Sequence, residues 1–174
     1  IDGETYTMKS TVAKLVAKRF GFVHISCGII FRALTFIALR ENADTADSSA
    51  LVAFAKAALK DISVQGDKVL YCGTETEKAV IDSARVFEMC NRFSSSAEIE
   101  QAVYNFLREY ASSRNVVADG REGGSIIFPN AQFKYYFIAS PERFHKAVYG
   151  EKEQLELLNA VNERDKEAGI VKRP

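Results

Sequence analysis

Apolar side chains recur at helical spacing early in the chain, over residues 9–20. The apolar positions of this stretch are Val12, Leu15, Val16 and Phe20. Gly21 follows directly, and glycine commonly ends a helix because it adopts the left-handed conformation without a steric penalty. Residues 1–3 have the character of a strand that runs into a loop, and residues 22–26 are a second strand candidate. The pattern therefore predicts strand, loop, helix and strand, in that order.

The remainder of the chain continues this alternation. Predicted helices cover residues 28–42, 48–60, 94–112 and 151–165, and a further helix begins at the Ser-Pro-Glu sequence of residues 140–142. Predicted strands cover residues 62–64, 68–71, 115–118 and 133–139. Asp47 precedes the second of these helices, where its carboxylate can accept the first backbone N–H groups. The Gln-Gly-Asp sequence at 65–67 predicts a hairpin turn.

Strands that alternate with helices predict an α/β fold, with a parallel sheet flanked by helices. A chain of 174 residues, 47% of them apolar, can bury the core of one domain. We therefore expect a single domain over residues 1–174. The hairpin is expected to belong to a small insert at about 62–90.

Charge and cysteine content narrow the classes of function. The 23 basic and 23 acidic residues cancel, so no strong basic field favours bulk nucleic-acid binding. The 3 cysteines form no closely spaced metal-type pair, which favours a reducing compartment. No apolar run approaches the length of a membrane span, and no targeting segment is visible. We expect a cytoplasmic or organellar-matrix protein without a membrane partner. Because the chain opens at Ile1 without a methionine, we expect it to be part of a longer polypeptide.

The loop after the first predicted strand has the plan of a phosphate-binding loop. Residues 3–10 read Gly-Glu-Thr-Tyr-Thr-Met-Lys-Ser, against the pattern G-x-x-x-x-G-K-[ST], with Met8 in place of the second glycine. Such a loop turns successive backbone N–H groups toward phosphate, and the following helix adds its positive end. Gly3, Lys9 and Ser10 are therefore candidate ATP-binding residues. The alternative interpretation is a polar turn with a solvated lysine, and this segment alone favours that alternative.

Four further segments match motifs of one enzyme family. Residues 26–33, Ser-Cys-Gly-Ile-Ile-Phe-Arg-Ala, resemble the motif D-[ST]-G-x-[MI]-Y-R-A. Residues 119–129 resemble D-G-R-D-x-G-T-V-V-F-P, residues 137–143 resemble F-L-x-A-S-P-E-x-R, and residues 163–165 match E-R-D. Together these segments resemble cytidylate kinases of the bacterial type, and the resemblance extends over nearly the whole chain. It implies the P-loop nucleoside monophosphate kinase fold and the transfer of phosphate from ATP, with Mg²⁺, to CMP or dCMP.

The resemblance also implies roles for individual residues. Lys9 and Arg164 would be catalytic, because they contact the phosphoryl group in transfer. Ser10 would hold Mg²⁺ directly, and Asp119 would hold it through water. Arg32 and Arg121 would bind CMP. A short lid is expected at about 143–155.

Several positions depart from the family pattern. Met8 replaces a glycine of the phosphate loop, and Ser26 and Cys27 replace the family's Asp-[ST] pair. Cys90 and Asn91 stand where an Ala-Ser pair meets the base, and Glu100 stands where an arginine faces phosphate. Each lost charge-assisted hydrogen bond to phosphate costs about 1.5–3 kcal/mol. The losses therefore predict weak nucleotide binding.

Two hypotheses of function follow. The first is a (d)CMP kinase of impaired activity. The second, which the substitutions favour, is a catalytically inactive kinase-fold subunit with protein or RNA partners in a larger assembly.

Two isolated side chains have less specific interpretations. His24 lies in a predicted strand and is interpreted as a structural histidine with satisfied hydrogen bonds. Cys27 precedes Gly28 at a helix start, where a thiol can become reactive, but a buried inert cysteine is the favoured interpretation.

Overall fold

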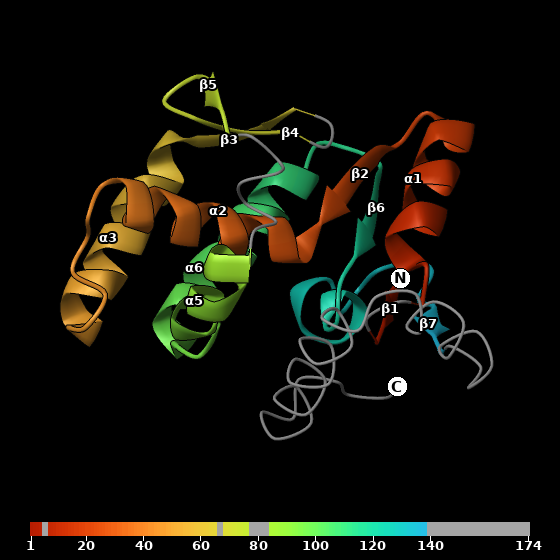
Figure 1. Ribbon diagram of the computed structural model, residues 1–174. Coiled ribbons are helices and arrows are strands. Elements are labelled where there is room, and N and C mark those ends of the chain that lie inside the picture. Colours follow the sequence, from red (N-terminus) through yellow and green to blue (C-terminus); the bar gives the residue numbers. More distant parts are fainter. Residues whose placement is uncertain (5–6, 66–67, 77–83, 139–174) are drawn as a thin grey trace. The chain divides into compact units, whose positions relative to one another are not determined.

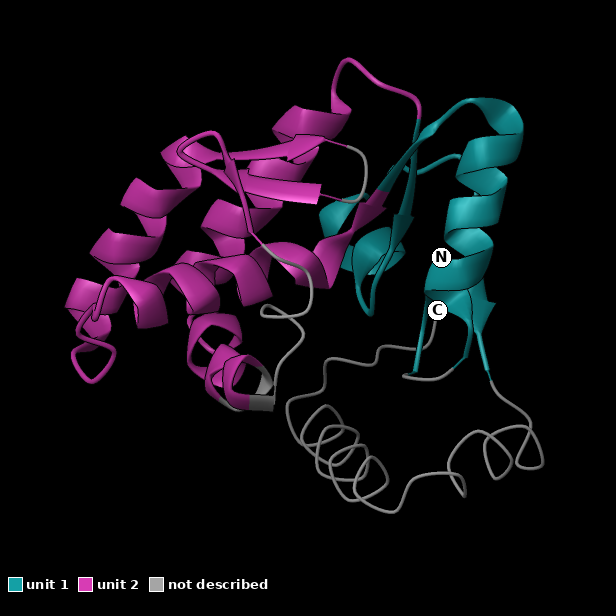
Figure 2. Cartoon of the chain, turned by 45° about the horizontal axis from the view of Figure 1, so that its top comes forward, with its two compact units in different colours: residues 1–24, 116–174 teal, residues 25–115 magenta. Residues whose placement is uncertain are grey.

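The computed structural model describes residues 1–4, 7–65, 68–76 and 84–138. The chain divides into two compact units, shown in different colours in Figure 2. Unit 1 comprises Ile1–His24 and Val116–Pro174, and unit 2 comprises Ile25–Asn115. The predicted helices that begin near residues 140 and 151, the lid at 143–155 and Arg164 lie outside the described residues.

Unit 1 is built on parallel strands, as the alternation predicts. β1 (Asp2–Gly3) pairs in parallel with β7 (Tyr136–Phe137). On its other side Asp2 forms a parallel bridge to Gly120, directly after β6 (Val116–Asp119). α1 (Lys9–Phe20) packs against β6, and Figure 1 shows the two elements running side by side. β2 (Val23–Ser26), which pairs with β6, begins at the end of unit 1. A short π-helical turn, η1 (Gly123–Ile127), follows β6.

The buried face of α1 differs from the predicted one. Ala13 and Ala17 are its buried residues, whereas Leu15 and Phe20 are 62% and 65% exposed. The small alanine side chains allow the helix to pack closely on β6, and this leaves the larger apolar residues outside. The predicted bounds are confirmed, because α1 begins at Lys9 and ends before Gly21, which has φ 68°.

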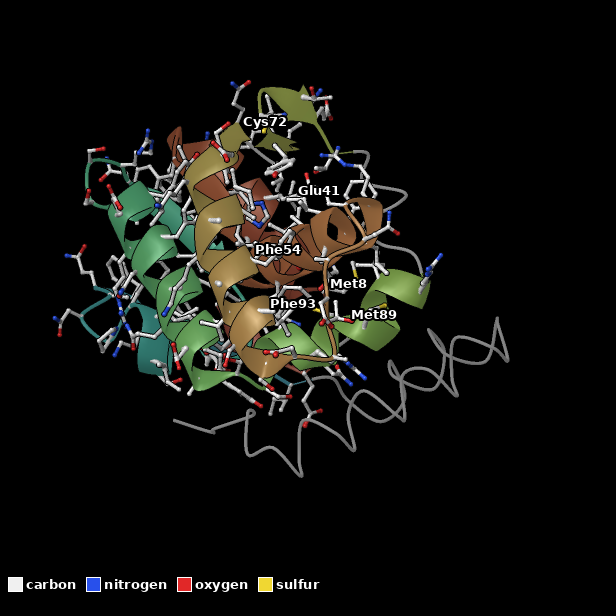
Figure 3. All side chains as sticks on the ribbon, turned by 90° about the vertical axis from the view of Figure 1, so that its left-hand side faces the viewer. Met8, Glu41, Phe54, Cys72, Met89 and Phe93 are labelled. Atoms are coloured by element: carbon white, nitrogen blue, oxygen red, sulfur yellow. The ribbon has the colours of Figure 1, made fainter. Side chains whose placement is uncertain are left out.

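Unit 2 is mostly helical. Its helices are α2 (Cys27–Arg40), α3 (Ser48–Asp61), α5 (Ala84–Ser94) and α6 (Ala97–Ala111). α2 is buried on most of its surface and packs against each of the other three. Phe93 of α5 is fully buried in this core, and Figure 3 shows it among the side chains of the helices. The predicted cap of α3 is confirmed, because the carboxylate of Asp47 accepts the N–H groups of Ser49 and Ala50. None of the helices in the described part of the chain has the length and apolar character needed to cross a bilayer.

The predicted hairpin forms one edge of unit 2. β3 (Ile62–Gln65) pairs antiparallel with β4 (Lys68–Tyr71), with Ile62 opposite Tyr71. A third strand that the sequence pattern did not indicate, β5 (Thr74–Glu75), pairs with β4. The inward residues Ile62, Val69 and Tyr71 are buried, which anchors this small sheet by one face.

The strand predicted at 133–139 is shorter than expected within the described residues. Only Tyr136–Phe137 forms a strand, whereas Phe133, Tyr135 and Ile138 are 58–71% exposed. These two residues are the ones that pair with β1.

Gly3 is required by this parallel pairing as well as by the loop that follows. A Cβ atom on Gly3 would lie 2.3 Å from the carbonyl oxygen of Phe137, and its φ is 151°. We expect Gly3→Ala to lower the free energy of unfolding by about 1–3 kcal/mol through overpacking, in addition to a dihedral cost of about 1–3 kcal/mol. Gly21→Ala is the matched control, because its φ is 68° and nothing lies within 4 Å of the added Cβ. Chemical denaturation should show the larger loss for Gly3→Ala, and equal losses would contradict this account.

Candidate active site

Hydrogen bonds to the carbonyl oxygen of Glu4 hold the loop between β1 and α1. Thr7 Oγ1 donates to this oxygen at 2.8 Å, and Lys9 Nζ donates to it at 3.0 Å. Residues 5 and 6, between Glu4 and Thr7, lie outside the described residues. The ammonium group of Lys9 therefore lies over the loop, where an incoming phosphate group can compete for it.

Met8 occupies a backbone conformation that normally calls for glycine. It is the residue before α1, with φ 63° and ψ 14° in the left-handed region. Its side chain is 55% exposed, and it is one of the residues labelled in Figure 3. A left-handed conformation costs a non-glycine residue about 1–2 kcal/mol. The chain thus keeps the turn of a phosphate loop although the residue that eases this turn is replaced.

The first turn of α1 is open to an anion. Met8 provides no side-chain cap, and the turn contains no acidic residue. The N-terminus of a helix carries a partial positive charge and unsatisfied N–H groups, which together favour a phosphate group.

Ser10 and Asp119 meet at the base of the loop. Ser10 Oγ donates to Asp119 Oδ1 at 2.7 Å, although the two residues are 109 positions apart. α1 carries Ser10 on its first turn, and Asp119 ends β6, on which α1 packs. Asp119 is only 2% exposed, so its carboxylate is held by protein groups rather than by bulk water. The packing thus brings together the two predicted metal-binding side chains.

His24 is the third member of this cluster. Its Nε2 lies 2.5 Å from Asp119 Oδ2, and its side chain is 9% exposed. The interpretation as a structural histidine agrees with the structure in that His24 is half-buried and paired with Asp119. Its ring is not fully satisfied, however, because Nδ1 is buried without a hydrogen-bond partner among the described residues. Position 24 alone gives no sign that its partner lies 95 residues further along the chain.

These contacts lower the pKa of Asp119. Burial is the largest influence and by itself raises the pKa, because it disfavours the charged form. The hydrogen bonds with His24 and Ser10, and then the charges of His24 and Lys9, act in the opposite direction and outweigh burial. Asp119 is therefore an anion at neutral pH, beside the phosphate loop.

The cluster suits Mg²⁺ in the presence of a nucleotide. A hydroxyl and a carboxylate are oxygen ligands of the kind that Mg²⁺ prefers, and this ion usually takes one or two protein groups together with phosphates and water. Among the described residues no group of three or more His, Cys, Asp and Glu forms a self-sufficient metal cage. Ser10 and Asp119 would thus hold Mg²⁺ only together with phosphate oxygens.

The segment after β6 carries Arg121, the next predicted CMP contact. Arg121 and Glu122 are half-buried and lead into η1. The carboxylate of Asp2 accepts hydrogen bonds from Gly123 N at 2.9 Å and Gly124 N at 2.8 Å. A carboxylate in the strand before the phosphate loop therefore holds the turn that follows Arg121.

Arg32 lies in unit 2, on α2. Its side chain is half-buried and runs back along the helix, so that a Cβ atom on Gly28 would be 3.8 Å from an Arg32 guanidinium nitrogen. The guanidinium therefore lies at the N-terminal end of α2, where its charge adds to the partial positive charge of the helix terminus. Cys27 in the same turn is buried, as the favoured interpretation of this thiol expects. That Arg32 faces Arg121 stays a prediction.

Comparisons with known proteins agree over most of the chain. A family model described as Cytidylate kinase matches residues 1–169. A cytidylate kinase of Lactiplantibacillus plantarum is 31% identical over 156 residues, which cover 87% of this chain and 67% of that protein. A cytidylate kinase of Caldanaerobacter subterraneus is 35% identical over 151 residues, with 87% and 66% covered. A cytidylate kinase of Fusobacterium nucleatum is 32% identical over 174 residues, with 95% and 78% covered. The matched region thus spans about two thirds to three quarters of these relatives.

Proposed function

Because this chain belongs to the cytidylate kinase family, and so has the P-loop nucleoside monophosphate kinase fold, we propose that it transfers the γ-phosphoryl group of ATP to CMP or dCMP. The observation that carries the proposal is the hydrogen bond between Ser10 and Asp119 at the base of the phosphate loop. This pair of oxygen groups lies beside Lys9 and the open end of α1, so one small region supplies both a cation site and an anion site.

On the donor side, the chain's own groups bind and orient the phosphates. The backbone at the start of α1 faces the anion, and Lys9 exchanges the Glu4 carbonyl for phosphate oxygens. Mg²⁺, when bound by Ser10 and Asp119, supplies positive charge that stabilises the transferring phosphoryl group. His24 holds the second oxygen of Asp119, so that the first remains directed at Ser10.

On the acceptor side, arginines bind the monophosphate. The guanidinium of Arg32, at the N-terminus of α2, would bind the phosphate group of CMP. The guanidinium of Arg121, which follows β6 in the chain, would be a second group that binds CMP. We propose that Arg164 also binds the phosphoryl group during its transfer. Guanidinium groups suit this task because they bind phosphate through two parallel hydrogen bonds.

We further propose that this phosphoryl-transfer activity is reduced. The left-handed Met8 adds strain to the folded loop, and its side chain stands where the family pattern has a glycine beside the phosphate. Glu100, on α6, is expected to repel the acceptor phosphate where the family pattern places an arginine. Both effects weaken nucleotide binding more than they alter the chemistry of transfer.

The test combines binding and turnover on the purified chain. Calorimetry is expected to give an ATP affinity weaker than low-micromolar in the presence of Mg²⁺, and a coupled assay is expected to show slow phosphorylation of CMP. Met8→Gly should tighten ATP binding, because it removes a side chain beside the proposed phosphate site, and it should relieve about 1–2 kcal/mol of dihedral strain in the folded loop. Unchanged ATP affinity in Met8→Gly would contradict the proposed effect of this side chain. Absence of binding and turnover in both proteins would reject the kinase proposal and favour the inactive assembly subunit.

A further inference from the structure

The carboxylate of Asp2 is buried and fully engaged by one distant segment. Asp2 is 8% exposed, and its oxygens lie 2.9 Å from Gly123 N and 2.8 Å from Gly124 N. The partners are 121 and 122 positions away in the chain. A carboxylate that accepts two backbone N–H groups makes strong, charge-assisted hydrogen bonds and fixes the direction of both peptide groups.

The main chain of Asp2 has a separate set of partners. Its N–H group donates to the carbonyl of Tyr135 at 2.8 Å, and it forms a parallel bridge with Gly120. Gly3 then leads directly into the phosphate loop. The backbone of Asp2 therefore anchors the loop, whereas its side chain anchors a different segment.

That second segment is a turn with unusual hydrogen bonding. Ile126 N and Ile127 N both donate to the carbonyl of Glu122, at 2.9 Å and 3.1 Å, and Phe128 N donates to Gly123 O at 2.7 Å. A π-helical turn is uncommon, and such turns gather at functional sites. The carboxylate of Asp2 satisfies the N–H groups of Gly123 and Gly124 at its start, and Gly123 is buried away from water. Without this acceptor the turn would begin with unsatisfied donors.

We propose that Asp2 is a positioning residue, which fixes Arg121 and Glu122 in register with the phosphate loop. The turn begins immediately after these two residues, so its start determines where they are held. Through its two sets of partners, Asp2 ties the segment proposed to bind CMP to the loop proposed to bind ATP. The inference rests on the proposed function for the identity of these ligands, but the mechanical link is a property of the chain itself.

The experiment uses Asp2→Asn, which keeps size and shape. An asparagine can accept one of the two N–H groups, but it turns its own NH₂ group toward the other. We expect amide hydrogen exchange at Gly123 and Gly124 to accelerate by more than about tenfold. The CMP dissociation constant should rise about tenfold, because a displaced Arg121 would lose one charge-assisted hydrogen bond to the phosphate. ATP affinity should stay within about twofold, because β1 keeps its backbone pairing.

Asp47→Asn is the control. Asp47 Oδ1 also accepts two backbone N–H groups, from Ser49 at 2.7 Å and Ala50 at 2.9 Å, and it lies at the start of α3. Because a single oxygen accepts both groups and asparagine caps a helix about as well as aspartate, this substitution should change neither the stability nor the two nucleotide affinities appreciably. Should Asp2→Asn fold poorly, Asp2→Glu is the second variant, because it keeps the charge and displaces the oxygens.

The outcomes separate the inference from the proposed function. Unchanged exchange at Gly123 and Gly124 would overturn the inference, and so would an equal loss of ATP and CMP affinity, which indicates general destabilisation. If the unaltered chain binds neither nucleotide, the proposed function fails. The exchange rates then still decide whether Asp2 holds the turn.

Discussion

Asp119→Asn is expected to lower the rate of phosphoryl transfer about 10–100-fold, the usual effect of removing a side chain that acts on a metal ion from the outer shell. Asparagine keeps the hydrogen bond to Ser10 in part, but it removes the negative charge that would attract Mg²⁺. The loss should be smaller at high Mg²⁺ concentration. Initial rates at several Mg²⁺ concentrations measure both effects.

A double-mutant cycle with Ser10→Ala tests whether the pair acts as a unit. Because Ser10 Oγ and Asp119 Oδ1 are 2.7 Å apart, the effects of the two substitutions should not be additive. Additive effects would mean that the two side chains act independently, which would contradict a shared role at the metal.

The same substitution should change the acid stability of the protein. The pKa of Asp119 is lowered in the folded state, so its ionised form stabilises the fold above the unfolded pKa of about 3.9. This contribution is lost as pH falls through the folded pKa. The difference in free energy of unfolding between the unaltered chain and Asp119→Asn should therefore shrink below about pH 4. Denaturation at pH 6 and below pH 4 measures this difference in free energy of unfolding. A difference that is the same at both pH values would contradict a lowered pKa of Asp119.

Arg32→Ala is expected to raise the CMP dissociation constant about 10–150-fold, because it removes a charge-assisted contact of about 1.5–3 kcal/mol. ATP affinity should hardly change, since Arg32 is assigned only to the acceptor. Calorimetry with each nucleotide separately measures the two affinities.

Arg40→Ala is the control for this prediction. Arg40 lies at the other end of α2, with its guanidinium carbon 5.8 Å from the Phe36 ring centre and 5.1 Å from the Tyr71 ring centre. Its removal should affect stability, through the loss of these cation–π contacts, and leave CMP binding intact. Equal weakening of CMP binding by both substitutions would assign Arg32 a structural role instead.

The elements that were predicted well have local causes. α1 has the predicted bounds because apolar spacing defines its length and Gly21 its end. α3 starts where Asp47 can cap it, and β3 and β4 pair across the predicted turn. In each case the residues that decide the structure lie within a few positions of one another.

The features that were not predicted are of two kinds. For α5 a usable signal existed, because Val86, Cys90 and Phe93 recur at helical spacing. η1 and the pairing of His24 with Asp119 had no local signal. Asp2, which holds the start of η1, lies 121 positions before Gly123, and His24 lies 95 positions before Asp119. Only the folded chain shows these contacts. The exposed Leu15 shows the same limit, since the apolar pattern does not reveal which face of α1 meets β6.

The left-handed Met8 has a consequence for how this loop can change in evolution. In the standard genetic code no single base change turns a methionine codon into a glycine codon. One intermediate is valine, whose branched side chain is especially unfavourable at a positive φ. The other is arginine, which would place a cation at the residue before α1, close to the proposed phosphate site. A change from Met8 to glycine therefore needs two base changes, and the route by way of arginine is the more accessible of the two.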